Sequence, residues 1–236
     1  MPTEETAEEV IRNFPYNNAN DFSAYMKTID MHYDFFKKSG TPYAELRSRV
    51  DVERSTIDTL KKLQSGDIYI VKGGDLDFFR EEEGKWDQIG SANIRSVYRE
   101  ALQRGVSIKV MENSDPIRKN LRKAEEIYKI LVELGLRPKL TNHNLRAVLA
   151  RKVDGNLSGA VWYNFSKHSD FFESDDPSLS TYKGYFISSE EKNCLHFLTS
   201  LEKNLTEIEN SATDYKDFVE KNKANFHRAR RGFIVN

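Results

Sequence analysis

The segment 66–166 alternates short β-rich runs with amphipathic helical stretches, and this order limits the chain to a small set of folds. Residues 68–71 read Ile-Tyr-Ile-Val and end at a glycine pair, which is typical of a buried strand. A helix is predicted at 91–103, where Gly105 stops it, and an alternating strand at 106–111 follows. Strand, helix and strand in this order predict an α/β sheet that begins with parallel strands.

The same pattern continues toward the C-terminus. Ser114 is a predicted cap for a long helix that ends at Leu134. Further strands are predicted at 137–141, 145–151 and 158–165, with a hairpin turn at 153–156 between the last two. Residues 166–182 are polar and acidic and are predicted to form a mobile loop, before a last short strand at 185–187.

Helices are predicted on both sides of this sheet region. N-terminal helices are expected at 3–13, 21–38 and 42–64, the last with Thr41 as its cap and Pro42 in its first turn. Ser188 and Glu191 fit a capping box for a long C-terminal helix to about 212, and a second helical piece is expected at 213–223. We therefore divide the chain into a helical N-terminal extension (1–65), an α/β domain (66–223) and a basic C-terminal tail (224–236).

Composition narrows the functional classes. The chain has 236 residues, of which 31% are charged, and a net charge of −1, so no global bias toward nucleic acid or an anionic membrane is predicted. The single Cys194 excludes an internal disulfide and a zinc site built from several cysteines. The acidic N-terminus does not resemble a signal peptide, and no apolar run has membrane-spanning length. A cytoplasmic protein without a cofactor and without membrane contact is the expectation.

Three pieces of the middle region carry a family resemblance. They are Arg104-Gly105-Val106 at a helix-to-strand junction, the run 142–146 before a strand, and the run 159–166, which ends Asn-Phe-Ser. Together they resemble the phospholipase D-like (PLD-like) superfamily over residues 66–212. The chain is also similar to PLD-like sensor domains of archaeal and bacterial signalling proteins, which keep the fold and lose the catalysis. The resemblance implies a mixed sheet flanked by helices, to which this chain adds a helical N-terminal layer and a long C-terminal helix.

The catalytic motif of that superfamily is only partly present. It needs His-x-Lys and an Asp five residues after the Lys; positions i and i+2 of a strand share one face, so the His and the Lys act together. This chain has His143, but Leu145 and Ala150 occupy the Lys and Asp positions. Arg146 is one residue late and is expected on the opposite face. The resemblance therefore implies a non-catalytic domain that senses a ligand or mediates protein contacts.

The expected ligand is a small anion bound near the strand ends. The candidate binding residues are His143, Arg146, Asn164 and Ser166. The apolar stripes of the helices in 20–65 and 189–222 are suited to pairing with a second copy, so a homodimer is expected. A protein partner is the other candidate for this surface.

Two alternative functions stay open. The first is a phosphodiesterase or nuclease in which His143 acts with another basic residue. The second is a nucleic-acid-binding module that uses the basic region 116–152, which has ten Lys or Arg against three Glu. Its candidate contacts are Arg118, Lys119, Arg122 and Lys123. The acidic loop 168–176 has no fixed ligand spacing, so we expect solvated charge there and no metal.

Overall fold

The computed structural model describes residues 22–73, 91–113, 128–143, 145–166, 180–191 and 193–218. Predicted features that lie wholly or partly outside these residues include the helix at 3–13, the start of the helix from Ser114, most of the loop at 166–182, the end of the helical piece at 213–223 and the tail at 224–236.

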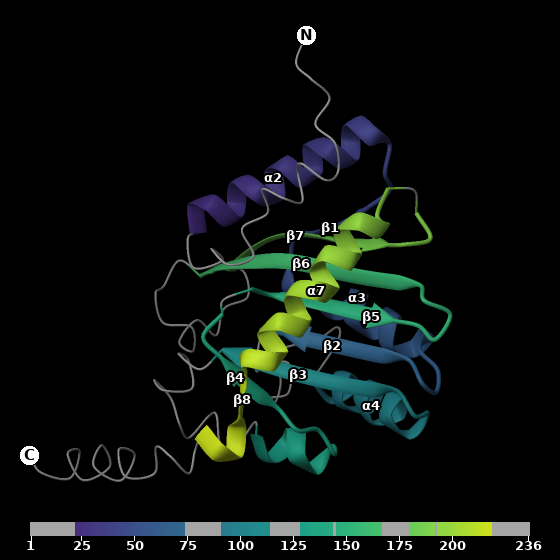
Figure 1. Cartoon of the computed structure of the whole chain (residues 1–236), viewed down its shortest axis with the longest axis vertical. Coiled ribbons are helices and arrows are strands. Elements are labelled where there is room, and N and C mark those ends of the chain that lie inside the picture. The colour runs from purple at the N-terminus through teal and green to yellow at the C-terminus, as the bar shows by residue number, and fades with distance from the viewer. Residues whose placement is uncertain are drawn as a thin grey trace, which may run out of the picture.

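Eight strands form one mixed sheet within the described part of the chain, in the order β1-β7-β6-β5-β2-β3-β4-β8 (Figure 1). The strand β2 pairs in parallel with β3, and β3 with β4, while all other neighbours are antiparallel. The bounds are β1 (Ala44–Leu46), β2 (Ile68–Lys72), β3 (Ser107–Asn113), β4 (Lys139–Thr141), β5 (Ala147–Arg151), β6 (Leu157–Ser166), β7 (Ser180–Ser188) and β8 (Thr213–Asp214). The predicted α/β class, with a mixed sheet that starts in parallel, is confirmed.

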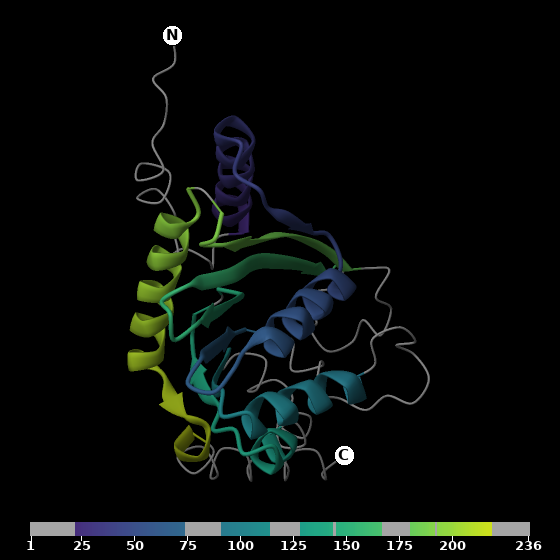
Figure 2. The ribbon, with the colours of Figure 1, turned by 90° about the vertical axis from the view of Figure 1, so that its right-hand side faces the viewer.

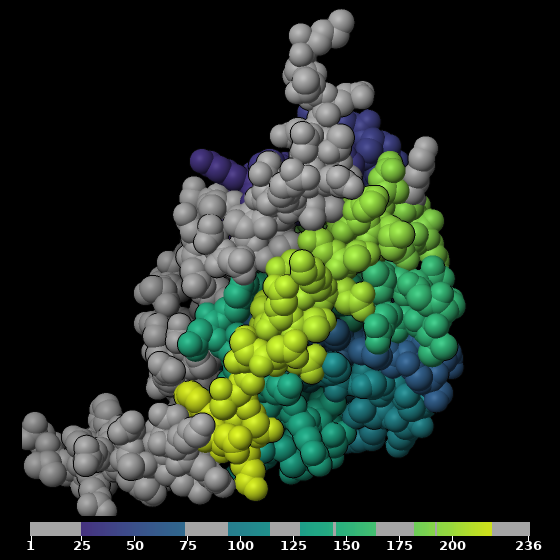
Figure 3. Space-filling model, in the orientation of Figure 1, coloured from purple at the N-terminus to yellow at the C-terminus, as the bar shows by residue number. Residues whose placement is uncertain are grey.

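Helices cover both faces of this sheet (Figure 2). On one face lie α3 (Arg49–Lys62) and α4 (Ser91–Gln103), and on the other lie α2 (Phe22–Ser39) and α7 (Leu195–Ser211). In the space-filling view α7 forms a ridge across its face (Figure 3). Two buried clusters result, one on each face, because successive strand residues point to opposite sides.

The predicted helix at 42–64 is wrong in its first part. Residues 44–46 form β1, which pairs with β7 and places Ala44 opposite Phe186. The helix α3 starts only after Ser48, whose side chain accepts a hydrogen bond from the backbone N–H of Asp51 at 3.2 Å. The N-terminal region is therefore not purely helical, since it contributes an edge strand to the sheet.

The C-terminal boundaries also differ from the prediction. The strand β7 starts at Ser180, so the end of the predicted loop is strand. The residues of the predicted capping box form a turn, in which the N–H of Glu191 donates to the carbonyl of Ser188 at 3.0 Å, and α7 begins only at Leu195. After α7, residues 213–214 form β8 rather than continuing as helix, and 215–218 are helical.

One arginine joins the ends of α3 and α4. Arg104 follows α4, and its guanidinium donates to the carbonyls of Leu60 at 2.6 Å and Leu63 at 3.1 Å. These carbonyls belong to the end of α3, where the helix leaves acceptors without partners and favours a positive charge. Gly105 then turns the chain into β3 with φ +86°. The Arg-Gly-Val junction therefore holds the ends of α3 and α4 together and leads the chain into β3.

No helix among the described residues is both long and apolar enough to cross a bilayer.

The helix α2 is attached to the sheet through aromatic side chains. His32 is fully buried and packs edge-on against Phe197, with ring centroids 4.8 Å apart. Its Nδ1 lies 2.6 Å from the hydroxyl of Tyr185 on β7. Tyr33 donates to the carbonyl of Gly184 at 2.6 Å. Burial lowers the pKa of His32 from 6.5 to about 3, so this imidazole is neutral in the folded protein.

This buried histidine predicts a loss of stability in acid. Between pH 6.5 and pH 3 the unfolded chain binds a proton at His32 and the folded chain does not, so the free energy of unfolding falls as the pH is lowered. The slope is at most about 1.4 kcal/mol per pH unit for one group. The measurement is urea unfolding of wild type and His32→Gln at several pH values. The difference between their free energies of unfolding at each pH gives the contribution of His32.

The matched control is His196→Gln, because His196 is exposed on α7. We expect this variant to keep the pH dependence of the wild type. Parallel curves for wild type and His32→Gln across pH 6.5 to 3 would contradict a neutral His32.

Candidate functional site

Several strands have their C-terminal ends on the same side of the sheet, which is called its carboxyl edge below. The parallel strands β2, β3 and β4 end there, and β6 does too, because β5 runs antiparallel to both β2 and β6 (left edge of the sheet in Figure 1). The connection 142–146 leads from β4 back to β5, so it crosses the ends of β3 and β2. The carboxyl edge of parallel strands is where α/β sheets commonly bind ligands.

The crossing passes close to the end of β2. Gly73 has φ +60°, and a Cβ atom there would lie 2.7 Å from the carbonyl oxygen of Leu145 and 3.3 Å from a side-chain carbon of Arg146. Only glycine allows both this backbone angle and this approach. Gly73, the first glycine of the pair noted in the sequence, therefore allows the connection from β4 to β5 to lie close against the end of β2.

Register brings three charged residues to this edge. Lys72 is the last residue of β2; it pairs with Met111 of β3 on one side and Ala147 of β5 on the other. Glu112 and Arg146 are the chain neighbours of those two partners. Lys72 is 0% exposed and Glu112 is 5% exposed, whereas Arg146 is partly exposed.

The ammonium group of Lys72 is electrostatically unusual. Its Nζ is buried and has no hydrogen-bond partner among the described residues. Burial lowers the pKa of Lys72 from 10.5 to about 8; the carboxylate of Glu112 opposes this effect, and the positive charge of Arg146 adds to it. Lys72 is therefore mostly charged at pH 7, in a place where burying a charge is costly.

His143 lies in the crossing connection and is partly exposed. Its backbone N–H donates to the Thr141 hydroxyl at 3.1 Å, and its ring Nδ1 accepts from the N–H of Leu145 at 3.2 Å. An Nδ1 that accepts a hydrogen bond carries no proton, so the neutral ring holds its proton on Nε2. In this tautomer Nε2 is a donor suited to an anionic oxygen and has no lone pair for nucleophilic attack.

The positive charge of Arg146 also acts on Tyr163 of β6. Burial raises the pKa of the Tyr163 hydroxyl, and the charge of Arg146 opposes the increase. The ring of Tyr163 lies 5.3 Å from that of Tyr25 on α2, measured between centroids.

The other predicted binding residues are placed only by their backbones. The N–H of Trp162 donates to the carbonyl of Arg146 at 3.1 Å, so Asn164 and Ser166 follow on β6, beyond this point, toward the carboxyl edge. Their side chains lie outside the described part of the structure. Arg118, Lys119, Arg122 and Lys123, predicted for nucleic acid, also lie outside it.

The two motif positions that differ from the superfamily are core positions. Leu145 is 0% exposed and packs in the cluster on the α7 face, while Ala150 is 2% exposed and packs in the cluster on the α3 face. Neither position can present a charged group to the edge without disturbing the core. The predicted strand at 145–151 begins only at Ala147.

The sequence reasoning missed Lys72 and Glu112. Both stand at the ends of buried strands, directly after Val71 and Met111, where the apolar pattern of each strand ends. A charged residue that directly follows a buried run, in two successive parallel strands, was the signal that could have found them. Among the described residues, no group of three or more His, Cys, Asp or Glu is placed to hold a metal ion.

Comparisons with known proteins give fold likenesses only. No protein-family model and no curated protein matches the chain. Among solved structures, the phospholipase D family member Nuc from Salmonella typhimurium is similar, with a TM-score of 0.46 and 9% identity over 74% of this chain and 98% of that one. The archaeal chromatin protein TrmBL2 gives a TM-score of 0.42 and 11% identity over 87% and 68%. Both scores are below 0.5, so neither likeness assigns a family or a function.

The burial of its ammonium group predicts that Lys72 lowers the stability of the fold. Replacing Lys72 by Met, which has similar length and no charge, removes an ammonium that has no hydrogen-bond partner among the described residues. We expect Lys72→Met to raise the free energy of unfolding at pH 7 by about 1–3 kcal/mol, measured by urea unfolding. The control is Lys109→Met, whose lysine is paired with Glu209 at 2.8 Å and is more exposed; its effect should stay within about 1 kcal/mol.

The same variant tests the pKa of Lys72. Between pH 8 and pH 10.5 the unfolded chain keeps the proton on Lys72 and the folded chain loses it, so wild type gains stability relative to Lys72→Met as the pH rises. A Lys72→Met protein that is destabilised like a core variant at every pH would show that Lys72 is a structural residue.

Proposed function

We propose that the chain is a non-catalytic, PLD-like ligand-binding domain that holds a small anion at the carboxyl edge of its sheet and serves in sensing or regulation. Lys72 and Arg146 are the proposed cationic contacts, and His143 is a hydrogen-bond donor to the same ligand. The PLD-like assignment rests on the sequence motifs and agrees with the mixed sheet.

The observation that carries the proposal is the buried Nζ of Lys72, which has no hydrogen-bond partner among the described residues. A fold retains such a group when it has a use, since an apolar side chain would be more stable there. Arg146 contributes a second positive charge at the same edge, and Glu112 is the opposing carboxylate. An anion that bridges Lys72 and Arg146 would relieve their mutual repulsion.

Phosphate-like groups suit this arrangement best. Arg146 is partly exposed, so an anion arriving from solvent meets it before it reaches the buried Nε2 of His143 and the buried Nζ of Lys72. A phosphate has several acceptor oxygens and can accept from a guanidinium, an imidazole Nε2–H and an ammonium at once. Low local polarity around Lys72 strengthens each of these contacts.

Two features support binding without turnover. The Nδ1 of His143 accepts the backbone N–H of Leu145, which leaves the proton on the nitrogen that would otherwise attack phosphorus. Leu145 and Ala150, at the motif's Lys and Asp positions, are buried in the two cores.

Calorimetric titration with inorganic phosphate tests the proposal. We expect wild type to bind it, and the double variant Lys72→Met/Arg146→Gln to bind at least tenfold more weakly, a loss of about 1.4 kcal/mol or more. The matched control is Arg151→Gln, at the opposite end of β5, where Arg151 is paired with Glu202 at 3.3 Å. Equal phosphate affinity for wild type and the double variant would refute the site.

A phosphodiesterase is the second candidate function. Lys72 is a buried lysine at the same carboxyl edge as His143, and it would take the role of the lysine that the motif lacks. Hydrolysis of bis(p-nitrophenyl) phosphate without added metal is the measurement. This candidate requires that His143→Ala and Lys72→Met each abolish a wild-type rate that Arg151→Gln retains. A wild-type rate equal to that of His143→Ala removes it.

The remaining sequence expectations stay predictions. They are the homodimer, a protein partner, a cytoplasmic location and nucleic-acid binding by the basic region 116–152.

A further inference from the structure

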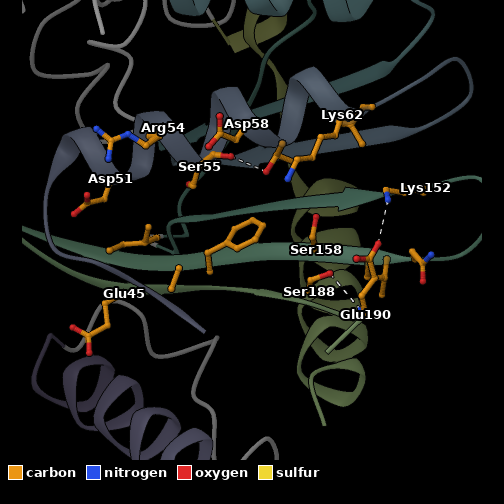
Figure 4. A pocket seen from close by; sticks show the side chains of 17 residues that line it. Glu45, Asp51, Arg54, Ser55, Asp58, Lys62, Lys152, Ser158, Ser188 and Glu190 are labelled. Atoms are coloured by element: carbon orange, nitrogen blue, oxygen red, sulfur yellow. Dashed lines mark hydrogen bonds and ion pairs between the residues drawn. The ribbon is translucent and has the colours of Figure 1, made fainter. Parts of the chain in front are cut away.

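A second concave site lies at the other end of the sheet. It is a hollow of about 400 Å³ between α3 and the strands β1, β7 and β6, and it reaches the turn between β5 and β6 (Figure 4). None of the residues predicted for ligand binding lines it. It therefore needs an explanation separate from the carboxyl edge.

The hollow exists because small side chains surround Phe186 on the α3 face. In the sheet register Phe186 lies between Ala44 of β1 and Ala160 of β6. In the next row on this face, Ser188 lies opposite Ser158. These side chains are too short to fill the space under α3, so the half-buried Phe186 side chain lines the hollow.

The centre of the hollow offers a ligand mainly apolar surface. Leu46, Leu63 and Leu157 contribute to the lining beside Phe186. The hydroxyls that α3 presents are already bonded within the helix: Thr59 donates to the carbonyl of Ser55 at 2.7 Å. A ligand body that rests here should be apolar, and an aromatic ring fits the open face of a phenylalanine best.

Charge separates the two ends of the hollow. At one end Glu45 and Asp51 are already engaged, Glu45 with the Arg47 side chain at 2.6 Å and Asp51 with the Arg47 backbone N–H at 3.0 Å. At the other end Lys62 and Lys152 face the same space from α3 and the hairpin turn, above Ser158 (Figure 4).

Neither of the two cations at the lysine end is held in a short ion pair within the described part of the chain. Lys62 makes no ion pair or hydrogen bond within the described part of the chain, and neither does Arg54, one of the other α3 residues in the lining. Lys152 has only a long contact with Glu190, at 3.4 Å, and Glu190 is 62% exposed. The whole lining has three cations, Arg54, Lys62 and Lys152, and four carboxylates, Glu45, Asp51, Asp58 and Glu190, of which Glu45 is paired with Arg47 outside the lining.

We propose that this hollow binds a small aromatic anion, with its ring against Phe186 and its acidic group between Lys62 and Lys152. The volume suits a ligand of one to three rings, since small-molecule sites usually span about 300–1,000 Å³. The ring supplies affinity by burial, and the acidic group sets the orientation through two ammonium donors and the nearby serine hydroxyls. The site does not depend on the phosphate site at the carboxyl edge and can be tested separately.

The test uses 1-anilinonaphthalene-8-sulfonate, an aromatic anion, and N-phenyl-1-naphthylamine, its uncharged counterpart, with fluorescence titration of the folded protein. We expect wild type to bind one molecule of the sulfonate. The double variant Lys62→Gln/Lys152→Gln should bind it at least tenfold more weakly, while its affinity for the uncharged compound changes less than twofold. Ser158→Leu should weaken the binding of both compounds, because the larger leucine side chain would occupy part of the hollow.

The matched control is Lys61→Gln. Lys61 is exposed on α3 beside Lys62 but does not line the hollow, so this variant should bind both compounds like wild type. Unchanged sulfonate affinity in the double lysine variant, or equal loss in Lys61→Gln, would overturn the anion assignment. Unchanged binding of both compounds in Ser158→Leu, with an unfolding curve like that of wild type, would overturn the location.

Discussion

The double pairing of β2 holds this structure together. The strand is parallel to β3 on one side and antiparallel to β5 on the other, so it joins the parallel part of the sheet to the antiparallel part. Because both registers are fixed by the buried pattern of the strands, the last residue of β2 has a fixed pair of neighbours. Lys72 consequently shares an edge with Glu112 and Arg146, although 74 residues of sequence separate Lys72 from Arg146. The candidate site is a consequence of strand register.

Burial then gives that edge its chemical character. An exposed lysine is an ordinary cation, whereas Lys72 is enclosed and its pKa is lowered to about 8. The hydrogen bond from the Leu145 N–H orients the ring of His143 and leaves the proton of the neutral ring on its buried Nε2. The hollow at the other end of the sheet arises differently. There, short side chains around Phe186 fail to fill the space beneath α3, and the cations line its rim.

Local patterns predicted the elements well where one physical signal dominated. Gly105 marked the end of α4, and the alternation of 106–110 marked β3. The errors fell where one sequence signal fits two different structures. Leu46 fits the apolar stripe of a helix and also the buried face of an edge strand, and only the pairing of β1 with β7 selects the strand. The capping box at Ser188 was misleading in the same way, because its residues close a turn after β7.

The sequence by itself determined the α/β class, the parallel start of the sheet, and the absence of the motif's Lys and Asp, because periodicity and residue identity are local properties. His143 and Arg146 could also be found from it. Only the tertiary structure decided that Lys72 belongs with them, that the Nδ1 of His143 is occupied by a backbone N–H, and that a hollow lies under α3. These features depend on register, burial and the packing of side chains from distant segments, and no local pattern encodes the distance between two strands.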